Sequence, residues 1–529
     1  MALPQRVASG PRVLALGHVI SETTRRVIRE RLAAESGRIE RDAPLRVGLA
    51  YPSPYAVGMS SLGYQRVYRA IQEHPAAAAE RIFLPDGGDR PGARIERPVS
   101  YEGLRGLDEL DLVAFSVAYE IEIAGLVRML DASNVPAFRE ERSARHPLVV
   151  AGGPLTFSNP RVLEPFADAI VLGEAEEVIS PLLDASVELP DRERALDALS
   201  GIQHVYVPAR HAELPPLAAC DDGLLPAWSQ IRTPHTELSD MFLIETERGC
   251  SRGCTYCVMR RSTNGGMRVV PEDVVLSAIP ENARRVGLVG AAVSDHPRIT
   301  QILNALADRG AEVGLSSLRP DRLKEELVHA LSRVGYRTLT TALDGASQRL
   351  RDTIERRGGE QHYLDAAERA KRHGMDRLKL YLMVGLPSET ETDIDECARF
   401  VSELSRILPV ALGIAPFCAK KNTPLDGMPF AGISVVDDRL DRLRRGLRGR
   451  ADVRATSARF AWVEYVLSQG GEAEARAAAE AARAGGRFAD YRRAFEALGH
   501  RPDGSGYREA VPPIPAQRLT RRPRPHPDA

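Results

Sequence analysis

The sequence predicts an α/β protein built from two successive units, each with a parallel sheet. Short apolar strands alternate with helices from about residue 45 to 180, and the alternation resumes from about 241 to 424. This alternation favours parallel sheets whose helical connections cover the sheet faces. A further observation locates the chemistry. Three of the six cysteines fall within eight residues, in a CxxxCxxC spacing, directly after the first predicted strand of the second unit.

The composition is that of an ordinary globular protein. The chain has 529 residues, 43% hydrophobic and 27% charged, which suggests about three domains. A formal net charge of −1 gives no global electrostatic reason to expect nucleic acid or a membrane surface as partner. No run of eighteen apolar residues and no signal-peptide core occur. We therefore expect a soluble, cytoplasmic protein in a compartment that keeps thiols reduced.

The first unit follows a short extension. Residues 1–44 contain one predicted helix, 21–36, which Ser21 would cap. Residues 45–180 then predict a flavodoxin-like, doubly wound parallel sheet with strands near 46–51, 81–84, 111–117, 147–151 and 169–172. Ligands of such sheets bind beyond the carboxyl ends of the strands, where this chain carries Ser116, Gly152 and Gly153.

The second unit follows a proline-punctuated connector, residues 181–238. Residues 239–425 predict six strand–helix units, two short of a closed eightfold barrel. Their strands lie near 241–247, 286–290, 312–316, 337–342, 377–384 and 409–415. Residues 426–500 are expected to be a helical C-terminal region. The Pro-, Gly- and Arg-rich residues 501–529 are expected to be a disordered, solvated tail.

The cysteine loop offers three thiolates to one metal centre: Cys250, Cys254 and Cys257. Three is one fewer than the Cys₄ shell of an ordinary iron–sulfur cluster, so one iron would stay open to an outside ligand. Zinc would need a fourth ligand, usually from a second pair with similar spacing. The remaining cysteines are scattered singly. Zinc and a plain electron-transfer cluster are the alternatives for this loop.

The loop resembles the signature of the radical S-adenosylmethionine (SAM) superfamily, including the aromatic Tyr256 before the third cysteine. This resemblance implies that the three cysteines bind a 4Fe–4S cluster and that SAM chelates the open iron. One electron then splits SAM into methionine and a 5′-deoxyadenosyl radical, which abstracts a hydrogen atom. The backbone near Tyr256 would lie by the adenine. The six strand–helix units match the open (β/α)₆ partial TIM-like barrel of the same family.

The resemblance extends to the ends of the later barrel strands. A loop ending in Asp295 takes the place of the family's Gly-Gly-Glu, without an acid in the usual position. The implied SAM contacts are Ser316 and Arg319 at the ribose and carboxylate, Asp344 at the ribose, and Gly385 at the adenine-side turn. For Arg319, pairing with Asp321 or solvent is the alternative.

Residues 45–180 look like the cobalamin-binding domain that precedes many radical-SAM cores. The resemblance rests on Gly152-Gly153-Pro154 after the fourth strand and Gly173-Glu174-Ala175-Glu176 after the fifth. The loop after the first strand lacks Asp-x-His-x-x-Gly, so no histidine there would ligate cobalt. Cobalamin is thus a candidate cofactor near Ser116, Gly152 and Gly153. The alternative is a cofactor-free domain that shapes the substrate cleft.

The predicted function is radical modification of an unactivated C–H position, with methyl transfer or rearrangement added if cobalamin binds. The family also implies an electron donor such as flavodoxin or ferredoxin. The alternative is a non-catalytic or electron-transfer iron–sulfur protein on the same scaffold. No peptide-binding or RNA-binding module stands out, so the sequence indicates no substrate class.

Overall fold

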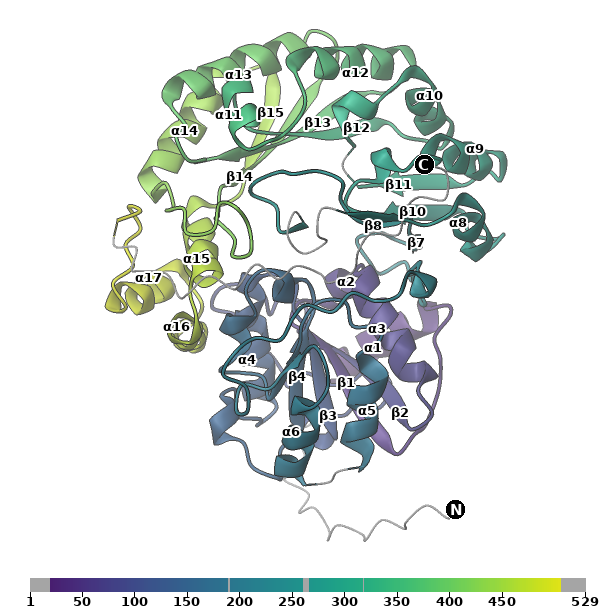
Figure 1. Cartoon of the computed structure of the whole chain (residues 1–529), viewed down its shortest axis with the longest axis vertical. Helices are drawn as coiled ribbons and strands as arrows, with labels where there is room; N and C mark the ends of the chain where they lie inside the picture. Colours follow the sequence, from purple (N-terminus) through teal and green to yellow (C-terminus); the bar gives the residue numbers. More distant parts are fainter. Residues whose placement is uncertain (1–19, 189–190, 260–265, 317, 506–529) are drawn as a thin grey trace.

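Two units with parallel sheets organise the protein in its computed structural model, one below the other in the view of Figure 1. The structure describes residues 20–188, 191–259, 266–316 and 318–505. The C-terminal tail predicted from residue 501 therefore lies outside the described residues from 506 onward. Among the described helices, none is long and apolar enough to cross a membrane.

The first unit has one six-stranded sheet in the order β2-β1-β3-β4-β5-β6, parallel except for the antiparallel β6. The five predicted strands are all present. The strands are β1 Leu45–Tyr51, β2 Ala77–Phe83, β3 Leu112–Ser116, β4 Leu148–Gly152, β5 Ala169–Val171 and β6 Val205–Tyr206. The helices are α1 Glu22–Ala34, α2 Tyr55–Gly58, α3 Leu62–Glu73, α4 Ile123–Ala132, α5 Ile179–Glu188 and α6 Arg192–Ser200.

Both faces of this sheet are buried, which explains why most residues of its strands are apolar. Val47 and Leu49 of β1 pack into one core with side chains of α3 and α5. Ala50 of the same strand, with Val113 of β3, belongs to the opposite core, which contains α4. Alternate residues of a strand point to opposite faces, so each strand serves two helix layers.

The predicted extension is tied to this unit. Ser21 caps α1 through its hydroxyl, as expected from the sequence.

The connector is more structured than its prolines indicate, because it contains α6 and β6, and α5 packs against α3.

The second unit is an open arc of parallel strands with helices along its outer side (Figure 1). One sheet has the order β11-β10-β7 and the other β12-β13-β14-β15, and a parallel bridge between Leu318 and Thr341 joins them. The strands are β7 Phe242–Glu245, β10 Arg285–Val289, β11 Glu312–Leu315, β12 Thr338–Asp344, β13 Arg377–Val384, β14 Val410–Pro416 and β15 Ala451–Ala455. The helices are α8 Glu272–Ala278, α9 Ile299–Asp308, α10 Glu325–Arg333, α11 Gln348–Thr353, α12 Glu360–Arg372, α13 Glu391–Leu404 and α14 Ile433–Gly446. The six predicted strands are confirmed.

One prediction needs correction. Residues 426–500 are not purely helical, because β15 adds a seventh parallel strand beside β14. The strand sequence, Ala-Asp-Val-Arg-Ala, has one strongly β-favouring residue, and its Asp452 and Arg454 are exposed. Charged, short edge strands resist further pairing but give a weak sequence signal.

The rest of the C-terminal region is helical and connects the two units. It contains α15 Ala458–Gln469, α16 Glu472–Arg483 and α17 Phe488–Ala497. Helix α16 packs against α4 of the first unit. The buried Asn159 amide donates hydrogen bonds to the carbonyl oxygens of Leu467, Ser468 and Gly470 at the end of α15. These contacts cap a helix C-terminus of the second unit with a side chain of the first.

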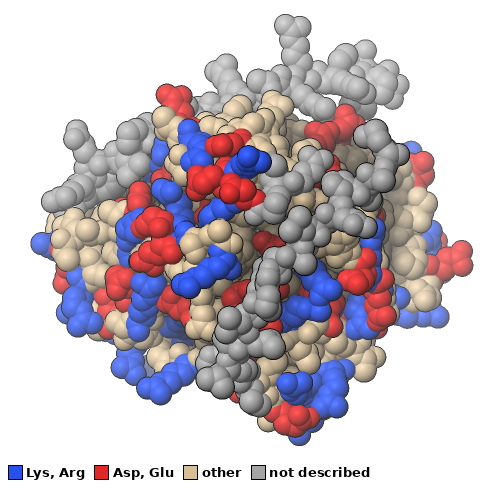
Figure 2. Space-filling view, turned by 90° about the horizontal axis from the view of Figure 1, so that it is seen from below, with Lys and Arg blue, Asp and Glu red and all other residues tan. Residues whose placement is uncertain are grey.

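The surface carries both signs of charge. On the face in Figure 2, basic and acidic side chains are interspersed over most of the visible surface. This distribution agrees with the near-zero formal charge of −1.

Arg81 in β2 provides a test of how the extension is held. Its side chain is fully buried and pairs with Glu35, just after α1, and with Glu102. We expect Arg81→Met to lower the free energy of unfolding by about 3–5 kcal/mol, since it leaves buried carboxylates unpaired. Urea unfolding followed by circular dichroism measures this loss. As control, Arg333→Met removes an exposed pair with Asp308 and should cost less than about 1 kcal/mol. Equal losses in the two variants would show that the buried pairs do not hold the extension.

Candidate functional site

The CxxxCxxC motif follows the first strand of a short β-hairpin at the carboxyl end of β7. Strand β8, Glu247–Gly249, pairs antiparallel with β9, Met267–Val269, and the cysteines follow β8 directly. Gly249 adopts φ +92, a conformation that favours glycine, and so turns the chain into the loop. The three thiols therefore lie on the loop that follows the first strand of the arc, the end at which α/β barrels carry their chemistry.

All three loop cysteines are free thiols; Cys254 is buried and the other two are half-buried. Burial raises the pKa of Cys250, and the neighbouring Cys254 adds to this. Burial likewise raises the pKa of Cys257 to about 11, with Cys254 and Cys250 adding to the effect. The thiols of Cys250 and Cys257 thus both lie near enough to Cys254 for its charge to act on them.

The donor set fits an iron–sulfur cluster better than a single zinc ion. Among the described residues, the group of three metal-ligating atoms within 4.8 Å of one another is Glu174, Glu176 and Cys220, not the three loop cysteines. A zinc ion with bonds of about 2.3 Å to sulfur would need closer thiols. A cubane spreads its cysteines over several irons, so the wider spacing of the loop suits it.

Tyr256 anchors the loop to β12. Its hydroxyl donates to Asp344 Oδ2 at 2.7 Å, and Arg356 Nε lies 2.9 Å from the same oxygen. Burial and the Asp344 charge raise the pKa of Tyr256, so it stays a donor. Asp344 itself adopts φ +60, which Asp tolerates better than most residues. The predicted ribose-binding carboxylate thus holds the cluster loop in place.

A second set of charges anchors the other side of the loop. Arg252 Nε lies 3.3 Å from Asp295, and its Nη2 lies 3.2 Å from Asp321. Arg319 Nη1 approaches Asp295 at 2.9 Å, and its Nη2 donates to both oxygens of Asp321 at 2.6 and 2.7 Å. Asp295 is nearly fully buried. Arg319 therefore pairs with Asp321, which was the alternative considered from the sequence. A contact of Arg319 with the SAM carboxylate stays a prediction.

The two other predicted SAM contacts lie at strand ends. Ser316 is exposed after β11, and its hydroxyl donates to the carbonyl oxygen of Gly290 at 3.1 Å. Gly385 follows β13 with φ +91, and its amide donates to Glu389 Oε2 at 2.7 Å. Ser316 therefore joins the ends of neighbouring strands, and Gly385 forms the expected glycine turn.

Ser116, Gly152 and Gly153 lie together at the carboxyl ends of β3 and β4, two central strands of the first sheet. Ser116 pairs with Gly152 across β3 and β4, and Gly153 follows with φ +103. A Cβ on Gly153 would lie 2.7 Å from the Val117 carbonyl oxygen, so the backbone itself requires glycine there. A Cβ on Gly152 would meet nothing closer than Val171, at 3.6 Å. The backbone conformation and packing therefore require glycine at position 153 but not at position 152.

Sequence reasoning missed several residues of the site. Glu247 is buried at the start of the hairpin, and its Oε1 accepts a hydrogen bond from the Ala292 amide at 2.8 Å. Burial raises its pKa to about 7. Arg248 and Arg268 lie opposite each other on the hairpin and reach carboxylates of the first unit. The sequence did carry a signal for these residues: Glu245, Glu247 and Arg248 interrupt the end of an otherwise apolar strand.

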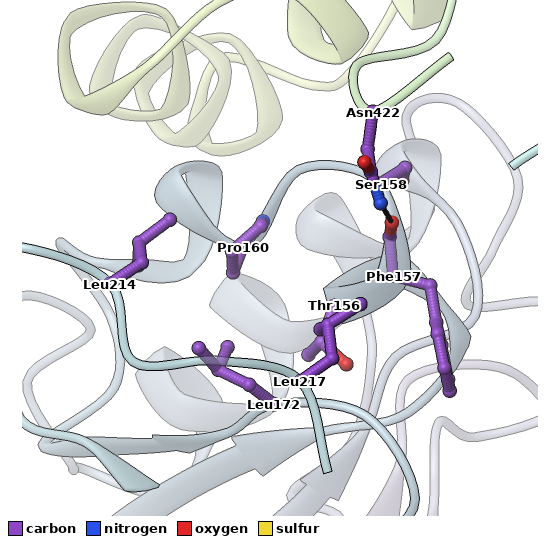
Figure 3. A pocket seen from close by; sticks show the side chains of 8 residues that line it. All are labelled: Thr156, Phe157, Ser158, Pro160, Leu172, Leu214, Leu217 and Asn422. Atoms are coloured by element: carbon purple, nitrogen blue, oxygen red, sulfur yellow. Dashed lines mark hydrogen bonds between the residues drawn. The ribbon is translucent and has the colours of Figure 1, made fainter. Parts of the chain in front are cut away.

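A small pocket lies where the two units meet. Asn422 of the second unit donates to the Phe157 carbonyl oxygen at 2.9 Å, as the dashed line in Figure 3 shows. The lining side chains are mostly apolar. They are Thr156, Phe157, Ser158, Pro160, Leu172, Leu214, Leu217 and Asn422.

Two family models match consecutive parts of the chain. Residues 63–208 match the model described as radical SAM proteins, N-terminal, and residues 244–401 match the model described as the radical SAM superfamily. The first match covers most of the six-stranded sheet, and the second runs from β7 to α13.

Several known proteins are similar in sequence or fold. An uncharacterized protein of Methanocaldococcus jannaschii is 24% identical over 395 residues, which span 73% of this chain and 80% of that protein. The ribosomal protein uS12 methylthiotransferase RimO of Kineococcus radiotolerans is 25% identical, over 69% of this chain and 76% of its own. An uncharacterized methyltransferase of Pyrococcus horikoshii is 23% identical, over 48% of this chain and 58% of its own. The solved cobalamin-dependent SAM radical enzyme OxsB, with aqua-cobalamin bound, overlays with a TM-score of 0.48 at 13% identity, covering 70% of this chain and 53% of its own.

Asp344 offers a test of the loop anchor. We expect Asp344→Ala to lower the free energy of unfolding by about 3 kcal/mol, because it unpairs Arg356 and Tyr256 and places alanine at positive φ. Asp344→Asn should cost about half as much, since asparagine tolerates that φ and still accepts from Tyr256. Urea unfolding of both variants measures the difference. Equal losses would mean that neither the charge nor the backbone conformation matters at this position.

Proposed function

Since this chain belongs to the radical SAM superfamily, we propose that Cys250, Cys254 and Cys257 bind a 4Fe–4S cluster with which it cleaves SAM reductively. The observation that carries the proposal is the set of three free thiols in the loop that follows β8, at the carboxyl end of β7. The chemistry supplied when the cluster is bound is one-electron cleavage of SAM to methionine and a 5′-deoxyadenosyl radical, which abstracts a hydrogen atom. The donor of that electron would be a protein such as flavodoxin or ferredoxin.

The surrounding residues orient the loop and shield it from water. Tyr256 ties its C-terminal half to Asp344, and Arg252 ties its centre to Asp295 and Asp321. Because Cys254 is buried, water has little access to its sulfur, which favours a stable cluster. The same contacts keep the three cysteines that would hold the cluster at the carboxyl ends of the strands.

The proposed SAM contacts lie along these strand ends. Ser316, Arg319, Asp344 and Gly385 follow or end β11, β12 and β13. Ser316 is exposed, and its hydroxyl, which donates to the Gly290 carbonyl oxygen, can still accept a hydrogen bond from an outside partner. Arg319 and Asp344 already have partners within the protein, so we assign them to shaping the site as well as to contacting SAM.

A more specific reaction follows from the N-terminal unit. Its strand order β2-β1-β3-β4-β5 is that of the flavodoxin-like type, whose ligands bind at the edge that holds Ser116 and Gly152. We propose cobalamin as its ligand and transfer of a methyl-type group as the reaction. The names of two relatives, a methyltransferase and a methylthiotransferase, support group transfer.

The cluster assignment is tested by anaerobic reconstitution. The wild type is expected to hold about one 4Fe–4S cluster and, with reductant and SAM, to release 5′-deoxyadenosine. Cys254→Ala should abolish both, because it removes one of three ligands. Iron, sulfide and nucleoside are measured together.

Cys418→Ala is the matched control, since its thiol lies outside the loop and donates to the Ala461 carbonyl oxygen. It should keep both cluster and turnover. A Cys254→Ala protein that retains its iron and sulfide, or a wild type that binds only zinc, contradicts the assignment.

Cobalamin binding is tested with hydroxocobalamin, desalting and visible and paramagnetic-resonance spectra of the reduced protein. We expect retained corrin without histidine nitrogen coupling, because the loop at residues 51–63 contains no histidine. Gly152→Leu should lower retention at least about tenfold, because its side chain would occupy the edge that a flat corrin must approach.

Gly201→Leu is the control for an added side chain, because Gly201 is exposed at the end of α6. Histidine coupling would refute the ligation claim. Wild-type protein that retains no corrin favours the cofactor-free domain.

A further inference from the structure

The hairpin that leads into the cluster loop places two arginines directly opposite each other. Arg248 in β8 pairs with Arg268 in β9 in the antiparallel register, and Cys250 comes two residues after Arg248. Like charges directly opposite on a two-stranded sheet are destabilising. A two-stranded hairpin is itself only marginally stable, so these charges require partners.

The partners come largely from the first unit. Arg248 Nη1 lies 3.2 Å from Glu174 Oε2, and its Nη2 lies 2.9 Å from Glu176 Oε1. Arg268 forms a short ion pair with the other Glu174 oxygen. Both glutamates belong to the loop after β5. Glu174 thus lies between the two guanidinium groups and neutralises their repulsion.

The second unit contributes one further carboxylate. Glu245, at the end of β7, accepts from Arg248 Nε at 2.6 Å and from its Nη2 at 2.8 Å. Arg248 therefore bridges three carboxylates from two units with a side chain that is 17% exposed. Arginine's planar group with five N–H donors allows this, whereas lysine is a single point charge.

These contacts also argue against a metal ion at this place. Glu174, Glu176 and Cys220 lie close enough to ligate one cation. Two guanidinium groups, however, already occupy the space beside them, and Arg248 Nη1 lies 3.2 Å from the Cys220 sulfur. Although burial alone would raise the pKa of Glu174, Arg248 and Arg268 lower it overall. The two glutamates and the two arginines thus form an ion-pair network that needs no metal ion to balance its charges.

We propose that Arg248 is a positioning residue through which Glu174 and Glu176 of the N-terminal unit fix the hairpin and hence the place of Cys250. In consequence, the first unit helps to build the cluster site. The contacts continue to the predicted ligand edge. The Gly173 amide donates to the Thr156 hydroxyl, which donates to the Gly153 carbonyl oxygen. The claim about the hairpin stands on the ion pairs alone, and only its effect on the cluster rests on the proposed function.

The first measurement is hydrogen exchange of the full chain without cluster, followed by mass spectrometry of peptides covering residues 242–257 and 266–270. We expect the double variant Glu174→Gln, Glu176→Gln to speed amide exchange in the hairpin about tenfold, since loss of its counter-charges favours local opening. Arg248→Gln should act in the same way. Arg248→Lys should exchange more slowly than Arg248→Gln but faster than wild type, since a lysine pairs with one carboxylate at a time.

Asp131→Asn is the matched control. Asp131 of α4 accepts two hydrogen bonds from Arg483 of α16, at 2.8 and 3.0 Å, and so also links the first unit to the C-terminal helices. This variant should leave hairpin exchange within about twofold of wild type, because it lies outside the network. If it speeds hairpin exchange as much as the glutamate variants do, general docking of the units explains the effect and the proposal fails.

The second measurement is the rate of iron loss to a chelator, with the paramagnetic-resonance spectrum of the reduced cluster. We expect the double variant to lose iron about tenfold faster than wild type, with an altered spectrum, because outer contacts orient metal ligands. If the hairpin amides of the double variant exchange as slowly as those of the wild type, the proposal is refuted, whether or not a cluster binds. If the double variant does not fold, Glu176→Gln alone, which keeps the Glu174 contacts, should give a smaller change in the same direction. A wild type without a cluster refutes only the proposed function, since the exchange measurement needs none.

Discussion

Ion pairs and a charge-assisted hydrogen bond between the cysteine loop and surrounding carboxylates are the interactions on which the site depends. Arg252 reaches Asp295 and Asp321, and Tyr256 reaches Asp344. Just before the loop, Arg248 reaches the first unit. A loop with three thiols must keep them separated for a cluster, and apolar contacts alone are non-directional. Charge-assisted hydrogen bonds are directional, so they can fix where each part of the loop lies.

Such contacts determine orientation more than stability. Bringing charged groups out of water costs several kcal/mol per ion, which pairing repays only in part. Breaking one partner is costly, because the other charge is then left without compensation. Buried pairs such as Arg81 with Glu35, and Arg319 with Asp295, therefore define single arrangements of their segments. The fold holds its segments by the same physical means in the extension and in the site.

The sequence predicted the strands well because most of them are buried and apolar. Residues 45–51 are buried almost throughout, and residues 377–384 alternate buried apolar side chains with exposed or half-buried ones, so both patterns indicate strands. It missed β15, whose Asp452 and Arg454 resemble a surface loop. The cysteine spacing is local and was visible. The partners of Arg248 were not, because Glu174 and Glu176 lie more than seventy residues earlier and meet it only through the packing of two units. Pairing of this kind depends on tertiary structure, which periodicity does not encode.

The glycine signals show why a motif needs the structure to be interpreted. Gly152 and Gly153 both matched a cofactor-binding pattern, yet the reasons for them differ. At Gly153 the positive φ and the Val117 carbonyl oxygen exclude a side chain whatever binds nearby. At Gly152 an added Cβ would meet Val171 no closer than 3.6 Å, so the fold itself does not require glycine there. The case for a flat cofactor at the carboxyl ends of β3 and β4 therefore depends on Gly152 and its strand neighbour Ser116, and Gly153 adds nothing to it.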